Sequence, residues 1–394
     1  MNYPIIKLKP GKEASSHYRH PWIFSGAIAS SEAQHGDLVQ LVDSTGLFLA
    51  VGTYSAESSI AVRLLDWKNV EINSVWFANQ FRSAQMRREL LGYGPGTPTT
   101  GYRVIFGESD EVPGLIVDRF ADVLVIQIAT AGLDVLRAEI VSALQEVFSP
   151  RAIVERSDMA VRSEEKLEPA VGVLFGDDPG LVEFTENGLK FVADVLKGQK
   201  TGFFCDQKDL RQAVRDLSAG RQALNLFSYS GSAGIAAIAG GAISVLNVDA
   251  SDSALLLCQR QAELNGIADD KWSNQTADIF EWLSPKQDPQ FDLVMIDPPA
   301  LIKSKRDIEQ GKKGYHFLNR AALRLVKDGG IFVSSSCSHF LTEDDLAFIL
   351  RRASIQANVK LQVLKVIHQS PDHPDSVYFP EAKYLKSFVC RVIR

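Results

Sequence analysis

The chain has 394 residues, of which 45% are hydrophobic and 23% charged, and its formal net charge is -6. These values are typical of globular proteins, and no apolar run approaches the roughly 20 residues of a membrane-spanning helix. We therefore predict two or three domains and no membrane association. The negative net charge argues against a surface that is basic throughout. The four cysteines at positions 205, 258, 337 and 390 do not have the spacing of a disulfide framework, and the N-terminal residues lack a secretory signal, so we expect free thiols in the cytoplasm.

Short β-like runs alternate with Gly, Ser and Asp turns as far as about residue 67, and this pattern predicts a small barrel. Residues from about 70 to 190 mix expected helices, at 75–92 and around 133–148, with expected strands, which indicates a separate α+β module. We therefore expect three domains, at residues 1–68, 69–190 and 191–394.

Strands and helices alternate in the last part of the chain, which predicts an α/β fold with a mostly parallel sheet and helices on both faces. Ligands of such sheets bind at the carboxyl ends of the strands. The two final strand-like runs, 361–369 and 386–393, have no helix between them, so we expect an antiparallel pair. The other expected strands are 223–227, 244–249, 291–297 and 331–336, and the expected helices are 231–240, 251–265, 317–327 and 342–356.

The turn "NLFSYSGSAG", residues 225–234, connects the first of these strands to a helix. Gly231 would let the backbone approach a ligand, and the helix start offers N–H groups. The turn alone fits a purely structural βα connection equally well. Asp249, 18 residues after Gly231, ends the next strand, where a carboxylate can accept hydrogen bonds from the ribose hydroxyls of an adenosine.

Asp297 ends the expected strand "FDLVMID" and is followed by Pro298 and Pro299. Because proline fixes φ and removes a backbone donor, the pair predicts a stiff rim that holds Asp297 against a planar substrate. The alternative is that the prolines only terminate the strand.

Cys337 follows the next strand, in the polar run "SSSCSH", residues 334–339. If these two strands are neighbours, their ends lie about 5 Å apart, so Cys337 and Asp297 face one pocket. A thiolate there suits nucleophilic attack on an electrophilic carbon. Cys258 and Cys390 are instead expected to be buried, as free cysteines commonly are.

Two basic segments stand out against the negative net charge. Residues 303–314 carry five Lys or Arg against two acidic residues, and residues 82–89 carry three Arg against one Glu. Such runs are usually solvated faces, but they can also contact phosphates. His373, between the last two strands, is expected to be a solvated loop histidine that could also reach the site.

Together these motifs resemble the RlmI-type family of S-adenosylmethionine-dependent 23S rRNA cytosine-5 methyltransferases, over nearly the whole chain. "LKPGKEASSHYRHPWIFSGAI", residues 8–28, is similar to the start of the family's RNA-binding PUA barrel, and "YRVIFGESDEVPGLIVDRF", residues 102–120, to the start of its central domain. "GQKTGFFCDQKDLR", residues 198–211, resembles its most specific motif. The resemblance implies a class I, Rossmann-like methyltransferase domain with a seven-stranded sheet.

The resemblance also implies the roles of particular residues. S-adenosylmethionine would be bound by its methionine part near Phe227, Ser228, Tyr229 and Gly231, by its ribose at Asp249, and near its adenine by Asp278. Asp297 would border the cofactor and contact the target base, and Cys337 would be the nucleophile. The substrate-binding residues would be Pro298, Pro299, Lys303, Lys305 and Arg306, and no metal site is implied.

Two positions depart from the family pattern. Ala300-Leu301 replaces a Lys-Phe pair that could touch RNA, and Gln207-Lys208 replaces a Gln-Arg pair. The first change removes a cation and an aromatic ring from the expected RNA contacts.

Other functions stay open. A guanine-N7 rRNA methyltransferase shares related motifs but needs no cysteine, so Cys337 favours cytosine C5. A catalytically inactive RNA-binding scaffold would retain the cofactor fold without turnover. A nicotinamide dehydrogenase is less favoured, because the glycines do not have the strict spacing of the dinucleotide-binding fingerprint. The expected partner is RNA, namely 23S rRNA. A homodimer is compatible with the sequence, which does not determine the oligomeric state.

Overall fold

The computed structural model describes residues 3–285 and 288–394. The chain divides into two compact units that each contain three segments of sequence. Unit 1 comprises residues 1–184, 193–205 and 371–382, and unit 2 comprises residues 185–192, 206–370 and 383–394. The expected division at residues 68 and 190 stays a prediction. Within the described residues, no helix is both long and apolar enough to cross a bilayer.

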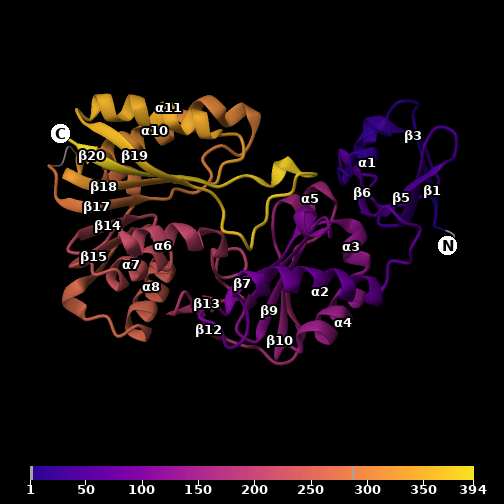
Figure 1. Ribbon diagram of the computed structural model, residues 1–394, viewed down its shortest axis with the longest axis horizontal. Helices are drawn as coiled ribbons and strands as arrows, with labels where there is room; N and C mark the ends of the chain where they lie inside the picture. Colours follow the sequence, from indigo (N-terminus) through magenta and orange to yellow (C-terminus); the bar gives the residue numbers. More distant parts are fainter. Residues whose placement is uncertain (1–2, 286–287) are drawn as a thin grey trace. The chain divides into compact units, whose positions relative to one another are not determined.

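The first part of unit 1 is a six-stranded sheet, drawn in indigo in Figure 1. Its neighbouring strands are antiparallel except for one parallel pair, β1 with β4. The core consists of aliphatic side chains that alternate along the strands, such as Val39 and Leu41. In spatial order the strands are β2 (Trp22–Phe24), β6 (Ile60–Asp66), β5 (Phe48–Tyr54), β4 (Leu38–Val42), β1 (Ile5–Leu8) and β3 (Ile28–Ser31). The short helices are α1 (Ala14–His17) and η1 (Ser25–Ala27).

A second, five-stranded sheet follows in unit 1. Helices α2 (Ser74–Leu90) and α4 (Arg137–Phe148) pack against each other and share a core with this sheet. The helix expected around 133–148 is two helices, because Leu136 leaves the helical conformation and separates α3 (Ala131–Val135) from α4. In spatial order the strands are β11 (Ala170–Phe175), β10 (Ala152–Ser157), β9 (Val123–Ile128), β8 (Leu115–Phe120) and β7 (Gly101–Phe106). Short helices are η2 (Gly107–Asp110) and α5 (Val161–Glu164).

A two-stranded hairpin, β12 (Leu181–Glu186) and β13 (Leu189–Asp194), comes next in the chain. Its two turn residues, Asn187 and Gly188, both have positive φ, at 49° and 78°. Asn-Gly is the favoured pair for a two-residue turn of this type, because both residues tolerate the left-handed conformation.

Unit 2 is built on a seven-stranded sheet, as the resemblance implied. The first five strands in spatial order are parallel, and β20 pairs antiparallel with both β18 and β19, which confirms the expected C-terminal pair. The order is β16 (Trp272–Thr276), β15 (Ser244–Asp249), β14 (Gln222–Leu226), β17 (Phe291–Ile296), β18 (Val326–Ser336), β20 (Lys386–Ile393) and β19 (Lys360–Ile367). The strand order reverses at β14, and such a point opens a crevice at the carboxyl ends of the strands.

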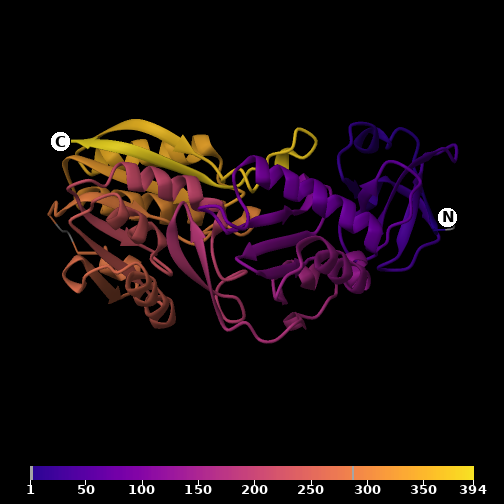
Figure 2. The same cartoon turned by 60° about the horizontal axis from the view of Figure 1, so that its bottom comes forward.

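Helices cover both faces of this sheet. Figures 1 and 2 show α10 and α11 on one face and α6, α7 and α8 on the other. The helix expected at 317–327 is wrong in its bounds, because α10 begins at Ile308, inside the basic segment, and ends at Arg324. The helices are α6 (Lys208–Asp216), α7 (Ser232–Ala239), α8 (Asp252–Leu264), α9 (Ile279–Trp282), α10 (Ile308–Arg324) and α11 (Glu343–Gln356). The short 3-10 helices are η3 (Cys205–Gln207), η4 (Asp269–Lys271), η5 (Lys305–Asp307) and η6 (Pro380–Ala382).

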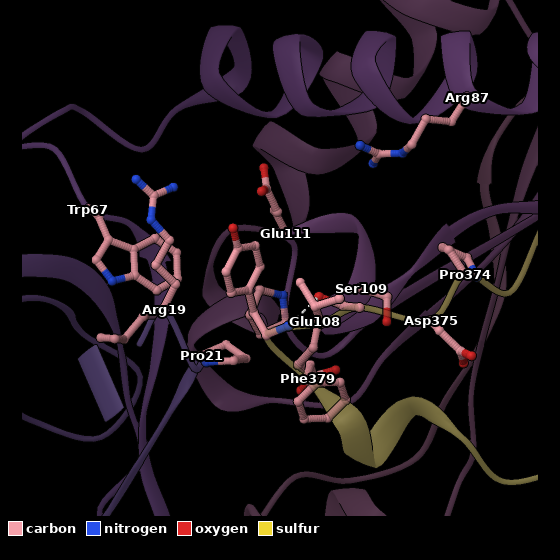
Figure 3. A pocket seen from close by; sticks show the side chains of 15 residues that line it. Arg19, Pro21, Trp67, Arg87, Glu108, Ser109, Glu111, Pro374, Asp375 and Phe379 are labelled. Carbon is pink, nitrogen blue, oxygen red and sulfur yellow. Dashed lines mark hydrogen bonds between the residues drawn. The ribbon is translucent and has the colours of Figure 1, made fainter. Parts of the chain in front are cut away.

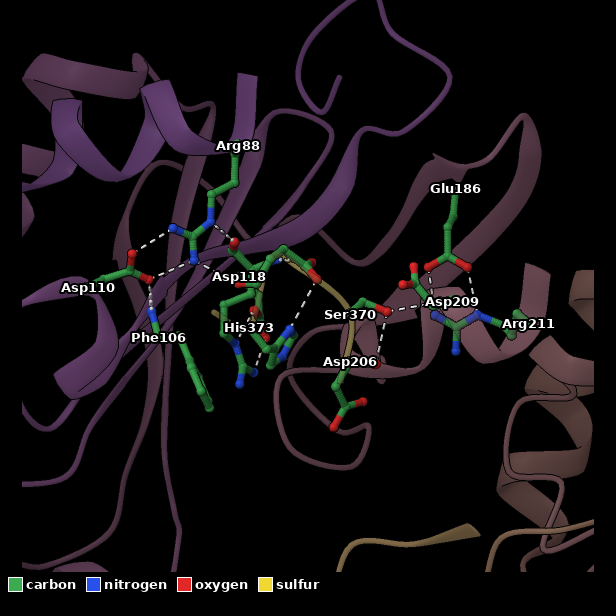
Figure 4. A network of polar contacts seen from close by, with 12 residues as sticks. Arg88, Phe106, Asp110, Asp118, Glu186, Asp206, Asp209, Arg211, Ser370 and His373 are labelled. Carbon is green, nitrogen blue, oxygen red and sulfur yellow. Dashed lines mark hydrogen bonds and ion pairs between the residues drawn. The ribbon is translucent and has the colours of Figure 1, made fainter. Parts of the chain in front are cut away.

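Buried ion pairs stabilise the second sheet of unit 1 (Figure 4). The Arg88 side chain is 1% exposed and makes two hydrogen bonds of 2.6 Å to the Asp110 carboxylate. A further N–H of Arg88 donates to the backbone carbonyl of Asp372 at 2.7 Å. Asp118 likewise accepts from Arg103 at 2.7 Å and from the Thr201 hydroxyl at 2.6 Å. These contacts bind segments 193–205 and 371–382 to the rest of unit 1.

His373 lies in segment 371–382 and is not solvated, contrary to expectation. Its side chain is 1% exposed, its Nδ1 atom is 3.2 Å from the Asp372 carboxylate, and its ring packs on Phe106 with centroids 5.1 Å apart. Phe106 and Asp372 also belong to unit 1, as does the segment that carries His373.

We predict that Asp110→Asn lowers the free energy of unfolding by roughly 3–5 kcal/mol, because it leaves the buried Arg88 guanidinium without its counter-charge. Urea denaturation measures the change. The control is Asp122→Asn, which breaks an exposed pair with Arg151 at 3.2 Å and should cost about 0–1 kcal/mol. Equal effects of the two substitutions would contradict the prediction.

Candidate functional site

The loop after β14 has an unusual backbone conformation. Phe227 and Tyr229 have positive φ angles of 59° and 46°, although neither is glycine. Such conformations cost on the order of 1 kcal/mol each and persist where surrounding contacts impose them. The constraint here includes Asp249 at the end of β15, whose carboxylate accepts from the Tyr229 N–H at 2.8 Å and from the Ser251 N–H at 3.0 Å.

The same loop contains two buried hydroxyl groups. Ser228 and Ser230 are 7% and 1% exposed, and neither hydroxyl has a hydrogen-bond partner among the described residues. Buried polar groups in proteins are almost always hydrogen-bonded. With the N-terminal N–H groups of α7, these hydroxyls are available to a polar ligand beside Asp249.

Gly231 is required by packing. A Cβ atom at this position would lie 2.4 Å from Sγ of Cys258 and 3.1 Å from the Trp272 ring. The glycine therefore permits the close packing of these two side chains, and its expected approach to a ligand stays a prediction. Cys258 is fully buried and its pKa is raised by desolvation, while burial raises the pKa of Cys390 to about 12. The expected burial of both thiols is confirmed.

Asp297 directly follows β17 and is half-buried. Its carboxylate accepts a hydrogen bond of 2.5 Å from the side-chain amide of Gln207. Pro298 is buried beside it, Pro299 is exposed, and the three cations of the following loop, Lys303, Lys305 and Arg306, are all exposed.

Gln207 is held by the start of α6. The Asp209 N–H donates to the Ser370 hydroxyl at 2.9 Å, and that hydroxyl donates to the Asp206 carbonyl at 3.0 Å (Figure 4). One turn later, Arg211 makes two 2.6 Å hydrogen bonds to the buried Glu186 carboxylate. The motif at residues 198–211 therefore orients the amide that contacts Asp297.

Asp278 is exposed and caps α9, since its carboxylate accepts from the Glu281 N–H at 3.0 Å. This is a structural role that sequence reasoning did not consider for this residue. Its expected position near an adenine stays a prediction.

Cys337 follows β18 and is partly exposed, in contrast to the serines around it. Ser334, Ser335, Ser336 and Ser338 are at most 1% exposed. The hydroxyls of Ser336 and Ser338 each lie 2.9 Å from the hydroxyl of Tyr315, which comes from α10. Ser335 similarly bonds to Ser387 of β20 at 2.8 Å. The polar run thus fixes both sides of the cysteine, which is itself only partly buried.

Tyr315 was missed by sequence reasoning. It is fully buried in the core of unit 2, and burial raises the pKa of its phenol. A buried tyrosine needs a partner for its hydroxyl. In the sequence, however, nothing marks it as a neighbour of residues 336 and 338.

Unit 1 contains a separate cavity of about 330 Å³ (Figure 3). Aromatic and charged side chains line it, including Trp67, Arg19, Arg87 and Glu111. Nε of Arg87 and the hydroxyl of Ser109 are buried there without a partner among the described residues. Segment 371–382 contributes Pro374 and Tyr378 to its wall, so no local sequence pattern could have predicted this cavity.

Comparison with known proteins defines the class. The model of a family described as S-adenosylmethionine-dependent methyltransferase matches residues 139–391, and that of a PUA-like domain matches residues 6–67. The chain is therefore an S-adenosylmethionine-dependent methyltransferase with an N-terminal PUA-like domain.

A relative from Serratia proteamaculans, named ribosomal RNA large subunit methyltransferase I, is 40% identical over 392 residues and covers 98% of each chain. A relative of the same name from Erwinia tasmaniensis is 38% identical with the same coverage. The chain belongs to this methyltransferase family.

A solved structure from Streptococcus mutans, described as a SAM-dependent methyltransferase, covers 98% of this chain and 99% of its own, with a TM-score of 0.83 and 22% identity. At that identity the likeness shows the fold, which is the class I methyltransferase fold expected from the sequence.

The cofactor of this family is S-adenosylmethionine, and the loop after β14 fits it. The cofactor supplies an electrophilic methyl group when bound. The buried hydroxyls of Ser228 and Ser230 would bind its polar groups, and the Asp249 carboxylate at the end of β15 would accept hydrogen bonds from its ribose.

We predict that Asp249→Ala weakens S-adenosylmethionine binding by roughly 1–3 kcal/mol, because a charged hydrogen-bond acceptor is lost and the Tyr229 N–H is released. Calorimetric titration measures the affinity. Asp252→Ala is the control. Asp252 is the exposed first residue of α8, and its carboxylate accepts a hydrogen bond from the Thr276 hydroxyl at the end of β16. Unchanged affinity for S-adenosylmethionine in the Asp249 variant would show that the ribose is bound elsewhere.

Proposed function

We propose that the protein methylates carbon 5 of a cytosine in 23S rRNA, with Cys337 as the nucleophile. The observation that carries this proposal is the parallel register of β17 and β18, which pairs Ile296 with Ser334. Neighbouring strands lie about 4.8 Å apart, and Asp297 and Cys337 follow them on the same edge of the sheet. The names of the relatives, which refer to large-subunit ribosomal RNA, support the substrate class.

The thiol explains how a poorly nucleophilic carbon can be methylated. The Cys337 thiolate adds to C6 of the cytosine, and the electron pair moves to C5. A C5–CH₃ bond then forms as the bond between the methyl group and its sulfur breaks. Loss of the C5 proton to a base and cleavage of the C6–S bond restore the ring and the thiolate.

Asp297 has an electrostatic role in this scheme. In its protonated form the Asp297 carboxyl group donates a hydrogen bond to N3 of the base and stabilises the negative charge that develops there on addition. Gln207 fixes the carboxylate at 2.5 Å, so the group is oriented before the base arrives. Guanine-N7 methylation needs no thiol, and the relatives do not favour it or an inactive scaffold.

The proposed RNA surface has two parts. One is the exposed loop with Lys303, Lys305 and Arg306, and the other is the PUA-like domain with the adjoining cavity of unit 1. Exposed Arg19 and half-exposed Tyr378 give this cavity the combination of cation and aromatic ring that suits unstacked bases. A 23S rRNA substrate supports a cytoplasmic location, and a homodimer stays a prediction.

For the nucleophile, we predict that RNA with 5-fluorocytosine at the target is trapped covalently, because fluorine blocks the elimination step. Cys337→Ala should abolish trapping and methylation and retain cofactor binding. Denaturing gels and methyl incorporation measure these effects. Cys258→Ala is the control, since it should keep trapping and lose stability by about 1 kcal/mol. Full methylation by the Cys337 variant would reject the cytosine-5 mechanism and favour guanine N7.

For the RNA surface, we predict that replacing Lys303, Lys305 and Arg306 by Gln weakens 23S rRNA binding. The slope of log K against log salt should fall by about 0.7–0.9 per lost phosphate contact, since fewer counterions are released. Filter binding at several salt concentrations measures the slope. Lys360, Lys365 and Arg391, exposed on β19 and β20, are the charge-matched control, and an equal loss in both triple variants would refute a specific loop contact.

A further inference from the structure

Lys386, the first residue of β20, is a buried lysine next to the candidate nucleophile. It is 6% exposed and pairs in register with Ser336 of β18, one residue before Cys337. Its Nζ atom donates to the Ser338 carbonyl at 2.6 Å and to the Tyr384 carbonyl at 2.9 Å. The ammonium group is therefore bound to the backbone on the other side of the cysteine.

A charged lysine at this depth requires compensation. Burial lowers the pKa of Lys386 to about 8, whereas the negative charges of Cys337, Asp345 and Glu343 act in the opposite direction. The group is therefore mostly protonated at pH 7. Interaction between two charges is mutual, so the thiolate that favours the ammonium is itself favoured by it.

The other acidic groups around Lys386 have partners of their own. Asp345 on α11 accepts from Lys312 of α10 at 2.6 Å, and Glu343 lies 2.7 Å from His368. Tyr315, which faces the same serines from α10, has a pKa raised by burial and is neutral at pH 7. The Lys312 ammonium group partly compensates the Asp345 carboxylate, which increases the relative weight of the coupling between Lys386 and Cys337.

We propose that Lys386 is a positioning residue for Cys337: its ammonium charge stabilises the thiolate, and its hydrogen bond to Ser338 fixes the peptide that carries the thiol. The catalytic meaning of this inference rests on the proposed function, in which that thiolate attacks the base. The coupling itself is a property of the folded chain and needs no RNA.

The test measures the alkylation rate of Cys337 by iodoacetamide between pH 6 and 10 in the full-length protein, with peptide-resolved mass spectrometry. Lys386→Arg retains the charge, Lys386→Gln retains a donor for the Ser338 carbonyl without charge, and Lys386→Met retains neither. Lys365→Gln, on exposed β19, is the control.

The Arg variant and the control should follow the wild-type profile. The Gln and Met variants should react about tenfold more slowly at pH 7 and approach the wild-type rate at high pH, a displacement of about one pH unit. If Lys386→Met does not fold, the Gln variant decides the matter. A wild-type profile in Lys386→Gln, or loss of neutral reactivity in Lys386→Arg, would overturn the proposal.

The result is distinguishable from failure of the proposed function. Absence of covalent trapping by 5-fluorocytosine RNA together with a displaced profile would reject the cytosine mechanism and keep the Lys386–Cys337 coupling. Covalent trapping together with an unchanged alkylation profile would support the cytosine mechanism and reject the Lys386–Cys337 coupling.

Discussion

Parallel pairing of β14, β15, β17 and β18 is the constraint on which the site depends. Because parallel strands all end at one edge, residues separated by nearly ninety positions, from Asp249 to Cys337, come to that edge. Each of β15, β17 and β18 contains a buried apolar segment, and the less buried residues Asp249, Asp297 and Cys337 stand at the end of these strands or directly after them. The hydrophobic core of the sheet thus determines the position of the residues at the strand ends. Because helices cover both faces, a ligand enters at that edge.

The polar end of β18 is stabilised differently from its apolar part. Buried hydroxyls are costly unless they are bonded, and those of Ser336 and Ser338 are bonded to Tyr315 and that of Ser335 to Ser387. A network of this kind has fewer acceptable arrangements than an apolar contact, so it limits the rotation of the intervening residue. The serines supply geometry, and Lys386 supplies charge.

Features carried by local sequence could be predicted, whereas those created by tertiary contacts could not. The strand-end residues Asp249, Asp297 and Cys337 follow apolar runs that can be recognised directly. The edge strand β16, "WSNQT", was missed because only Trp272 of its residues is buried, and the start of α10 was obscured by glycines and lysines that usually indicate a loop. The left-handed backbone of Phe227 and Tyr229, and the contacts of Tyr315 and Lys386 with distant segments, leave no pattern in the sequence at all.

Segment 371–382 belongs to unit 1 although it is encoded inside unit 2, between β19 and β20. During synthesis the first 184 residues leave the ribosome early, but Arg88 lacks its contact with the Asp372 carbonyl until almost the whole chain has been made. Domains of multidomain proteins commonly fold in order from the N-terminus. Here the N-terminal unit reaches its final structure only at the end of translation, so a truncated product, or a fragment expressed from residues 1–184, lacks part of the N-terminal unit itself.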